Sequence, residues 1–324
     1  MDLALRPMST SQVLDRTFYI YRNNFVLLAG IGSLLPALLL IMQLSFIPLG
    51  MPPRGNLNQA PELFAILLLG YVGCYGVIYL LGNALAGGAT VYGVSKLHLG
   101  ESITIGQAYK QVFSRFWRVL GVIVLLGLIV FGSIMIGEMI AIIVVAVTVG
   151  SSQIFGGGGG AAGVGMIFAV VWAVSIFAGA VLAALFFYSR LSLAVPACIL
   201  EKLPVGVSLR RSWHLTKGSV WRLILVHLLT WVLSIVLGLA LALPGQFYLI
   251  AMHNKQALVG IILQHLGGFI AGVIANPIAT TAIALIYYDQ RVRKEAFDLQ
   301  LMMEAVGQQP APQTVATAVP PALG

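Results

Sequence analysis

The sequence predicts an all-α integral membrane protein with six transmembrane helices, and three observations support that class. Of the 324 residues, 59% are hydrophobic and only 9% are charged, whereas a soluble globular protein carries about 25% charged residues. The mean hydropathy is +0.97. Apolar segments long enough to cross a bilayer, which takes about 20 residues, recur along the chain. A surface built from these residues suits lipid rather than water.

Six such segments form a predicted membrane domain at residues 25–292. The spans are predicted at residues 25–48, 63–97, 117–148, 166–199, 221–244 and 258–288. Several exceed the minimum length, so we expect helices that tilt or extend beyond the bilayer. Residues 1–24 lack the pattern of a cleavable signal, and we expect the first span itself to direct insertion.

The basic residues predict the orientation. Sixteen of the 18 Lys and Arg residues flank the spans on one side, and only Arg54 and Lys255 lie on the other. Because Lys and Arg accumulate in cytoplasmic loops, we expect both termini in the cytoplasm. The net charge of +8 then indicates anionic lipid headgroups as partners and not nucleic acid.

A similar amphipathic segment precedes the first, third and fifth spans. Aligning Phe25, Phe116 and Val220, at separations of 91 and 104 residues, superimposes three sets of residues at the offsets of one helix face. The sets are Leu14, Ile105 and Leu209; Phe18, Tyr109 and Trp213; and Tyr21, Val112 and Thr216. N-caps are expected at Ser9–Ser11, Ser102 and Ser208.

We interpret these segments as interfacial helices, with the apolar face in the headgroup boundary and the basic face toward anionic lipid. The chain is then a threefold repeat of interfacial helix and helical hairpin. The alternative is that juxtamembrane segments share this pattern without a repeat. Residues 1–24 hold the first cytoplasmic amphipathic helix, residues 293–306 a further one, and residues 307–324, rich in Pro, Gln, Ala and Thr, are predicted to be disordered.

Polar side chains inside spans are functional candidates by default. They are Asn83, Glu138, His227, His265 and Asn276. Glu138 and His265 fall at comparable depth near the outer edge of the membrane. They either form a proton-responsive pair, or the Glu138 carboxylate simply reaches the water at the outer interface. Asn276 precedes Pro277, which either breaks the helix to line a substrate site or makes a structural kink satisfied by Thr280 and Thr281.

Motifs of soluble catalysis do not occur in the sequence. It has no paired carboxylates at working spacing and no His-Glu-x-x-His, Cys-x-x-Cys or Gly-x-Ser-x-Gly. The run Gly156–Gly160 lacks the Gly-Lys-Ser/Thr ending of a phosphate loop and is interpreted as a flexible loop. Cys74 and Cys198 lie in or beside apolar segments and are expected to be unpaired. We expect no enzymatic activity, no cofactor and no metal site.

Three stretches carry a resemblance to a known family: Leu5–Phe25, Arg190–Arg222 and Leu285–Met303. With the six-span pattern they resemble the bacterial glycerophosphoryl diester phosphodiesterase membrane-domain family, over nearly the whole chain up to Val306. In that family the membrane region is sometimes fused to a soluble phosphodiesterase domain. We expect no such domain here, because the longest soluble stretch is the tail. The resemblance implies a lipid-associated or partner-supporting role at the bacterial inner membrane.

The residues that match the family pattern are expected near the cytoplasmic face. The candidate lipid-headgroup or ion-pair layer comprises Arg190, Glu201, Arg210, Arg211, Arg222, Asp289, Arg291 and Arg293. These side chains either lock the bundle by ion pairs or bind phosphate headgroups, because guanidinium groups grip phosphate bidentately.

The expected function is that of a non-enzymatic scaffold or accessory subunit that associates with anionic lipid or a partner membrane protein. The alternative is a transporter or translocator of a small molecule or lipid, with a site between the helices. Phosphodiester hydrolysis, carried by Glu138, His227 and Asp289, is a third interpretation.

Overall fold

Every element of the computed structural model is a helix within the residues it describes, which are 7–50, 61–154, 159–252, 257–296 and 303. Five helices are long and apolar enough to cross a membrane, and a bent pair of helices can form a sixth span. The predicted all-α membrane fold is confirmed. The elements are α1 (Thr10–Asn23), α2 (Phe25–Gly32), α3 (Leu34–Gly50), α4 (Pro61–His98), α5 (Ile105–Phe113), α6 (Phe116–Ile154), α7 (Gly159–Leu191), α8 (Ala194–Leu200), α9 (Val205–Thr216), α10 (Val220–Ala251) and α11 (Ala257–Glu295).

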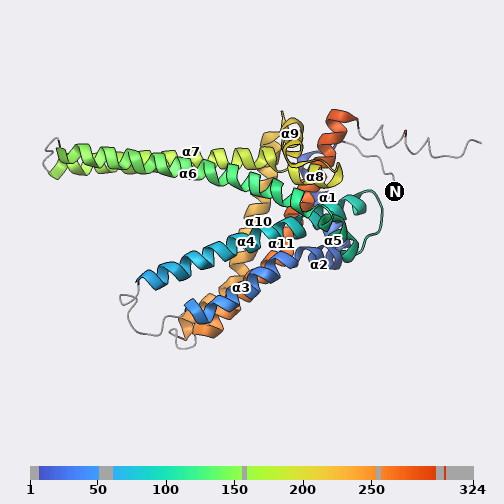
Figure 1. Cartoon of the computed structure of the whole chain (residues 1–324), viewed down its shortest axis with the longest axis horizontal. Helices are drawn as coiled ribbons and strands as arrows, with labels where there is room; N and C mark the ends of the chain where they lie inside the picture. Colours follow the sequence, from blue (N-terminus) through green and yellow to red (C-terminus); the bar gives the residue numbers. More distant parts are fainter. Residues whose placement is uncertain (1–6, 51–60, 155–158, 253–256, 297–302, 304–324) are drawn as a thin grey trace, which may run out of the picture.

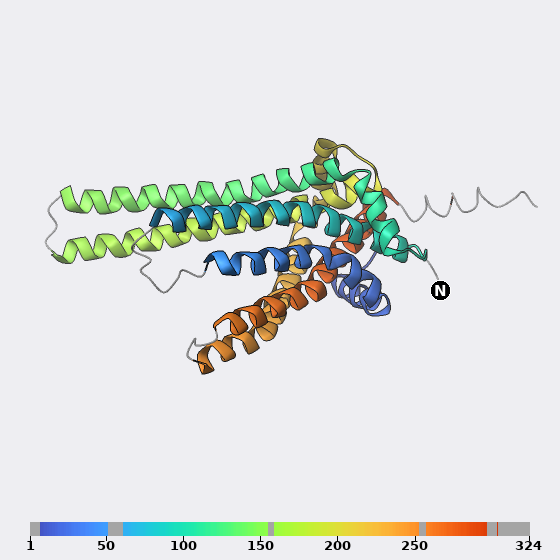
Figure 2. The same ribbon diagram turned by 60° about the horizontal axis from the view of Figure 1, so that its bottom comes forward.

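The long helices form three hairpins that converge at one end of the molecule (Figure 1). α3 packs along α4, α6 along α7, and α10 along α11. The short helices α1, α5, α8 and α9 gather where the hairpins converge, and the hairpins diverge away from them, as the turned view in Figure 2 also shows. We call this end the basic end, because its short helices, the turns beside them and the adjoining helix ends carry every Lys and Arg that the structure describes.

The first predicted span is bent by 44° where α2 meets α3. At the bend the Ser33 hydroxyl donates to the Gly30 carbonyl at 2.9 Å. A Cβ on Gly32 would overlap the Pro277 ring, so this glycine lets α11 approach the bend closely. α11 itself continues through Pro277 as one helix. The broken helix considered for this position is therefore not formed, and the Thr280 and Thr281 hydroxyls donate to carbonyls four residues earlier.

The fourth predicted span is divided into two helices. α7 ends at Leu191, and α8 follows from Ala194. The predicted segments 293–306 and 307–324 and the run Gly156–Gly160 fall largely outside the described residues.

Two of the three expected N-caps are wrong. Ser9 caps α1 as expected, with Gln12 completing a reciprocal capping box. α5 is capped by Thr104 and not by Ser102, because Thr104 has a glutamine, Gln107, at the third position of the helix to return the bond. α9 begins after Pro204, and Ser208 lies inside that helix with its hydroxyl bonded to the Pro204 carbonyl.

The threefold repeat is visible in which residues the short helices bury. α1 buries Val13, Thr17, Ile20 and Tyr21. The aligned positions of α9 are its own buried residues, Ser208, Ser212, Leu215 and Thr216. In α5 the aligned residues Ala108 and Val112 are buried. The three segments therefore present the same face to the protein.

The buried face matches the face expected from the sequence only in part: Tyr21, Val112 and Thr216 are buried as expected, but the aromatic positions before them differ. Phe18 and Trp213, expected on the common apolar face, remain 49% and 42% exposed. The positions just before them hold small residues, Thr17 and Ser212, which are fully buried. Small side chains allow close approach of a helix to its neighbours, so the large aromatic residues point outward instead.

The α10–α11 hairpin depends on glycine at its contact. A Cβ on Gly267 would overlap the Leu241 carbonyl of α10, whereas a Cβ on the adjacent Gly268 would meet no atom within 4 Å. We predict that Gly267→Ala lowers the free energy of unfolding by about 1–3 kcal/mol through overpacking. Gly268→Ala is the matched control and leaves stability equal or higher, because alanine favours helix. Thermal unfolding in detergent compares the two, and equal midpoints would contradict the close packing.

Candidate functional site at the basic end

A buried carboxylate, Asp289, joins three parts of the chain at the basic end. Its side chain is fully buried and lies near the end of α11. Arg222, at the start of α10, donates to Asp289 Oδ2 at 2.5 Å, and Arg293 donates to the same oxygen at 2.9 Å. The Met8 backbone N–H donates to Oδ1 at 2.6 Å. Both arginines also donate to the Met8 carbonyl, at 2.7 and 2.6 Å. We call these groups the Asp289 cluster.

A second cluster, the Glu201 cluster, comprises Glu201, Arg211, Tyr287, Arg291 and Glu295. Arg211 donates to both oxygens of Glu201, at 2.9 and 3.0 Å, and also pairs with Glu295. Arg291 lies 3.2 Å from Glu295 and 3.7 Å from Glu201. The Tyr287 hydroxyl donates to Glu201. The cluster therefore connects the turn after α8 with α9 and the end of α11.

The charges in this second cluster stabilise one another. Burial alone would lower the pKa of Arg211, but the hydrogen bonds and negative charges of Glu295 and Glu201 outweigh it and raise that pKa above its ordinary value. Each carboxylate accepts several hydrogen bonds, so its oxygens are occupied. The two clusters support the interpretation of an ion-pair layer for six of the eight candidate residues.

Arg190 and Arg210 make no ion pair among the described residues, so for these two only the headgroup alternative stays a prediction. Arg190 donates to the Trp213 carbonyl at 3.3 Å and lies 4.1 Å above the Trp213 ring. The Arg190 carbonyl in turn accepts from Ser212 at 2.7 Å, so this arginine joins the end of α7 to α9. Arg210 is exposed. It lies on the opposite face of α9 from the buried Ser208 and Ser212, where no described acid reaches it.

A pocket of about 320 Å³ lies beside the Glu201 cluster, and its charged lining residues are all basic. We call it the basic pocket. It is lined by Tyr92, Ser95, Lys96, Leu99, Gln111, Arg115, Ile199, Leu200, Lys202, Tyr288 and Arg291. These residues come from the end of α4 and the turn after it, α5 and the turn between α5 and α6, the end of α8 and the turn after it, and α11. The pocket therefore forms only where the three repeats meet.

The four basic side chains of this pocket differ in their partners. Lys96 pairs with Glu101 at 2.7 Å, and Arg291 belongs to the Glu201 cluster. Arg115 donates to the Ile199 carbonyl at 2.7 Å, and Lys202 is exposed. Among the described residues no acid pairs with Arg115 or Lys202. The pocket thus retains positive charge that the protein does not neutralise.

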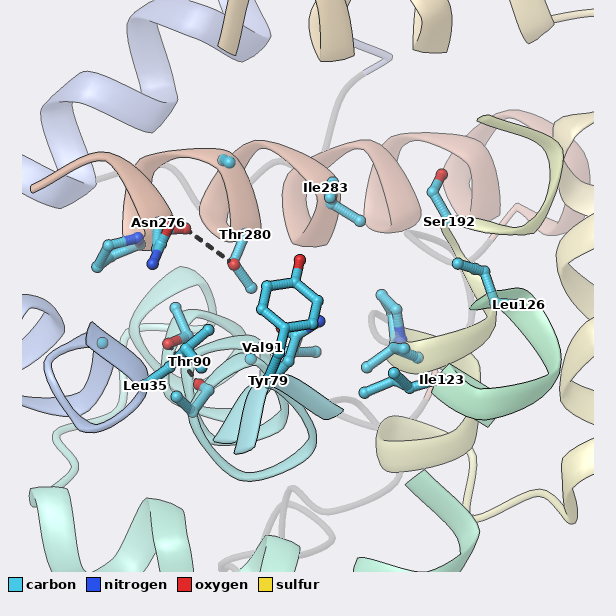
Figure 3. A pocket seen from close by; sticks show the side chains of 18 of the residues that line it. Leu35, Tyr79, Thr90, Val91, Ile123, Leu126, Ser192, Asn276, Thr280 and Ile283 are labelled. Carbon is cyan, nitrogen blue, oxygen red and sulfur yellow. Dashed lines mark hydrogen bonds between the residues drawn. The ribbon is translucent and has the colours of Figure 1, made fainter. Parts of the chain in front are cut away.

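A second, more apolar cavity of about 370 Å³ lies deeper between the helices. Two of the predicted intramembrane polar residues line it, Asn83 from α4 and Asn276 from α11. In Figure 3, Asn276 and Thr280 face Leu35, Tyr79 and Thr90 across this space. We call it the mid-span cavity.

The other three intramembrane polar residues do not line this cavity. The His227 ring is buried and packs edge-on against the Tyr188 ring, 4.9 Å away, which itself lines the cavity. The proposed Glu138–His265 pair is not formed. Gly137 faces α7, where an added Cβ would overlap Ala180, and this turns its neighbour Glu138 outward to an exposed position. His265 lies on α11, in the hairpin that diverges from α6 (Figure 1).

The chain matches a known family over residues 163–314, a region described as the membrane domain of glycerophosphoryl diester phosphodiesterase. The match covers slightly less than half of the chain and supports the family resemblance over that region. No curated protein and no solved structure matches the chain.

The matched membrane domain contains most of the site. It includes α8–α11, with all side chains of both ion clusters, and Lys202 and Arg291 of the basic pocket. Two of the three stretches that carried the resemblance, Arg190–Arg222 and Leu285–Met303, lie within it, and Leu5–Phe25 precedes it. Lys96 and Arg115 also precede it, so the basic pocket joins the family domain to the first half of the chain.

Sequence reasoning missed several members of the site. Glu295 and Tyr287 lie in the third stretch of the resemblance but were not singled out, and Met8 contributes only backbone atoms. Lys96, Arg115 and Lys202 were recognised only as basic residues on one side of the membrane. The sequence placed these three residues on the same side of the membrane. Only the tertiary structure shows that they line one pocket.

The Asp289 cluster yields a stability prediction. Asp289→Asn leaves Arg222 and Arg293 without their shared anion, and we expect the free energy of unfolding to fall by about 3–5 kcal/mol, as when one partner of a buried ion pair is removed. Glu101→Gln removes the exposed pair with Lys96 and is expected to cost at most about 1 kcal/mol. Denaturation in detergent micelles measures both; a loss no larger for Asp289→Asn than for Glu101→Gln would contradict the cluster's structural role.

Proposed function

We propose that this protein is a non-enzymatic, lipid-associated scaffold or accessory subunit of the bacterial cytoplasmic membrane, with its basic end in the cytoplasm. One observation carries the proposal: the two ion clusters fasten four chain segments into one end, from which apolar hairpins diverge. The clusters join residue 8, the α8–α9 region, the start of α10 and the end of α11. Such an arrangement favours a rigid basic end from which the apolar hairpins extend into lipid.

The exposed apolar surface supports the association with lipid. Along the hairpins, large side chains such as Ile142, Leu182 and Leu239 are each more than 60% exposed. Exposed apolar surface of this extent is typical of membrane contact. Because the hairpins diverge (Figure 1), lipid or a partner membrane protein has access to their flanks.

Aromatic residues support the placement of the basic end at the membrane–water interface. Trp117 and Trp221, at the starts of α6 and α10, are 79% and 83% exposed. Each is followed by an arginine, Arg118 or Arg222. Tryptophan beside Lys and Arg is typical of the headgroup region, and an excess of basic residues favours the cytoplasmic side.

The engaged carboxylates support a non-enzymatic role. At the basic end Asp289, Glu201 and Glu295 already accept bonds from arginines, so none offers an unoccupied oxygen to take a proton from a substrate. Glu138 is exposed on the apolar hairpin, far along α6 from this end. The phosphodiesterase name of the family is therefore not extended to an activity of this chain.

The test uses the full-length protein purified in mild detergent. Native mass spectrometry is expected to find bound anionic phospholipid in preference to zwitterionic phospholipid, and assays with glycerophosphodiesters are expected to show no hydrolysis. Hydrolysis that copurifies with the protein and is lost in Glu138→Gln or His227→Gln would overturn the proposal, and so would lipid retention without any preference for anionic headgroups.

The mid-span cavity favours one other function, translocation of a lipid or an amphiphile between the helices. Asn83 and Asn276 would supply polar contacts within a lining that is mostly apolar but also holds hydroxyl groups such as that of Thr280. In reconstituted vesicles, a translocator would move labelled phospholipid between leaflets, and Asn83→Leu would slow that movement without lowering the unfolding temperature. Our proposal instead predicts the rate of protein-free vesicles for both the wild type and Asn83→Leu.

A further inference from the structure

We propose that the basic pocket binds a phosphate group, carried by an anionic lipid headgroup or by a soluble phosphate compound. This inference rests on the proposed association with lipid and names the chemistry and residues that would recognise the ligand. The pocket volume of about 320 Å³ is at the lower end of the range for small-molecule sites. It is large enough for a phosphate with a small substituent.

The pocket brings together donors of the kind that phosphate requires. Arg115, Arg291, Lys96 and Lys202 carry positive charge, and Gln111 and Ser95 add neutral polar groups. Arginine presents several N–H donors in one plane and matches two phosphate oxygens, while lysine acts as a point charge. Since no Asp or Glu is among the lining residues, the pocket selects an anion over a cation.

Arg115 is held in place before any ligand binds. Its Nη1 donates to the Ile199 carbonyl at 2.7 Å, and it is half-buried at the mouth of α6. That bond uses one of the five N–H donors of the guanidinium. Arg115 therefore has a fixed orientation and further donors, which is the arrangement that lowers the entropic cost of binding an oxyanion.

Lys202 adds an independent observation, because its backbone conformation is unfavourable for lysine. Its φ is +62°, in the left-handed region, where L-residues other than glycine are strained. It directly follows Glu201, the residue that caps α8, a position where helices usually have glycine. Strain of this kind clusters at functional sites. A lysine at this turn supplies the pocket with a charge that the more favourable glycine would lack.

Acids beside the basic pocket neutralise part of its positive charge. Glu101 pairs with Lys96, and Glu201 and Glu295 contact Arg291. Arg115 and Lys202 are therefore the two cations that carry the proposal. They lie on opposite sides of the family boundary, one before and one within the matched domain.

The test compares variants of the protein with two kinds of probe, soluble phosphate compounds and an anionic lipid. Inorganic phosphate and glycerol 3-phosphate are titrated calorimetrically in detergent, and the preference for phosphatidylglycerol over phosphatidylcholine is measured by native mass spectrometry from nanodiscs of both lipids. Lys202→Gly and Arg115→Gln are expected to weaken binding by about tenfold each, the effect of losing one hydrogen bond to a charged group. Arg210→Gln removes an exposed arginine outside the pocket and is the control, with unchanged binding.

Lys202→Gly also separates a charge role from a structural one. Glycine relieves the left-handed φ, so the variant is expected to unfold at the same or a higher temperature while it binds less. If both pocket variants bind both probes as the wild type does, the proposal is overturned, even though retained anionic lipid would still support the proposed function. Weakened binding confined to the soluble phosphates identifies a soluble ligand, and weakened binding confined to phosphatidylglycerol identifies a headgroup.

Discussion

A carboxylate without access to water has to be compensated by positive charge or hydrogen bonds, and the burial of Asp289 imposes this constraint on the whole basic end. The aspartate lies on α11, but its compensating groups come from the start of α10 and from the backbone at residue 8. Satisfying one side chain thus sets the relative positions of three segments. The Glu201 cluster extends the same principle to α9 and the turn after α8.

With the basic end held in this way, the remaining helices are free to meet the bilayer. Hairpin contacts are made where glycine permits backbone approach, as at Gly267 and Gly137. Farther from the basic end the hairpins diverge, and their apolar side chains are exposed (Figure 1). Because the backbone hydrogen bonds are already satisfied within the helices, the hairpins can expose apolar side chains to lipid. The Lys and Arg side chains that the structure describes are confined to the basic end.

Much of this fold could be predicted from the sequence because apolar length and charge placement are strong signals. The repeat was also predictable from shared offsets, but its buried face was predictable only in part. Hydrophobicity favoured Phe18 and Trp213, whereas packing selected the small residues before them, Thr17 and Ser212. The site was only partly predictable for a similar reason: charge type indicated the arginines and acids, but which arginine meets which acid, and that Arg190 stacks on Trp213, is decided by tertiary contact.

The bond between Met8 and Asp289 spans 281 residues of chain, and this has a consequence for biosynthesis. The amino-terminal segment leaves the ribosome first, yet its anchor is made last, after α11 has entered the membrane. Until then the Met8 backbone and Arg222 lack their common anion. Closure of the Asp289 cluster therefore has to wait for the last helix, and a chain truncated before α11 lacks the carboxylate that anchors its amino-terminal segment.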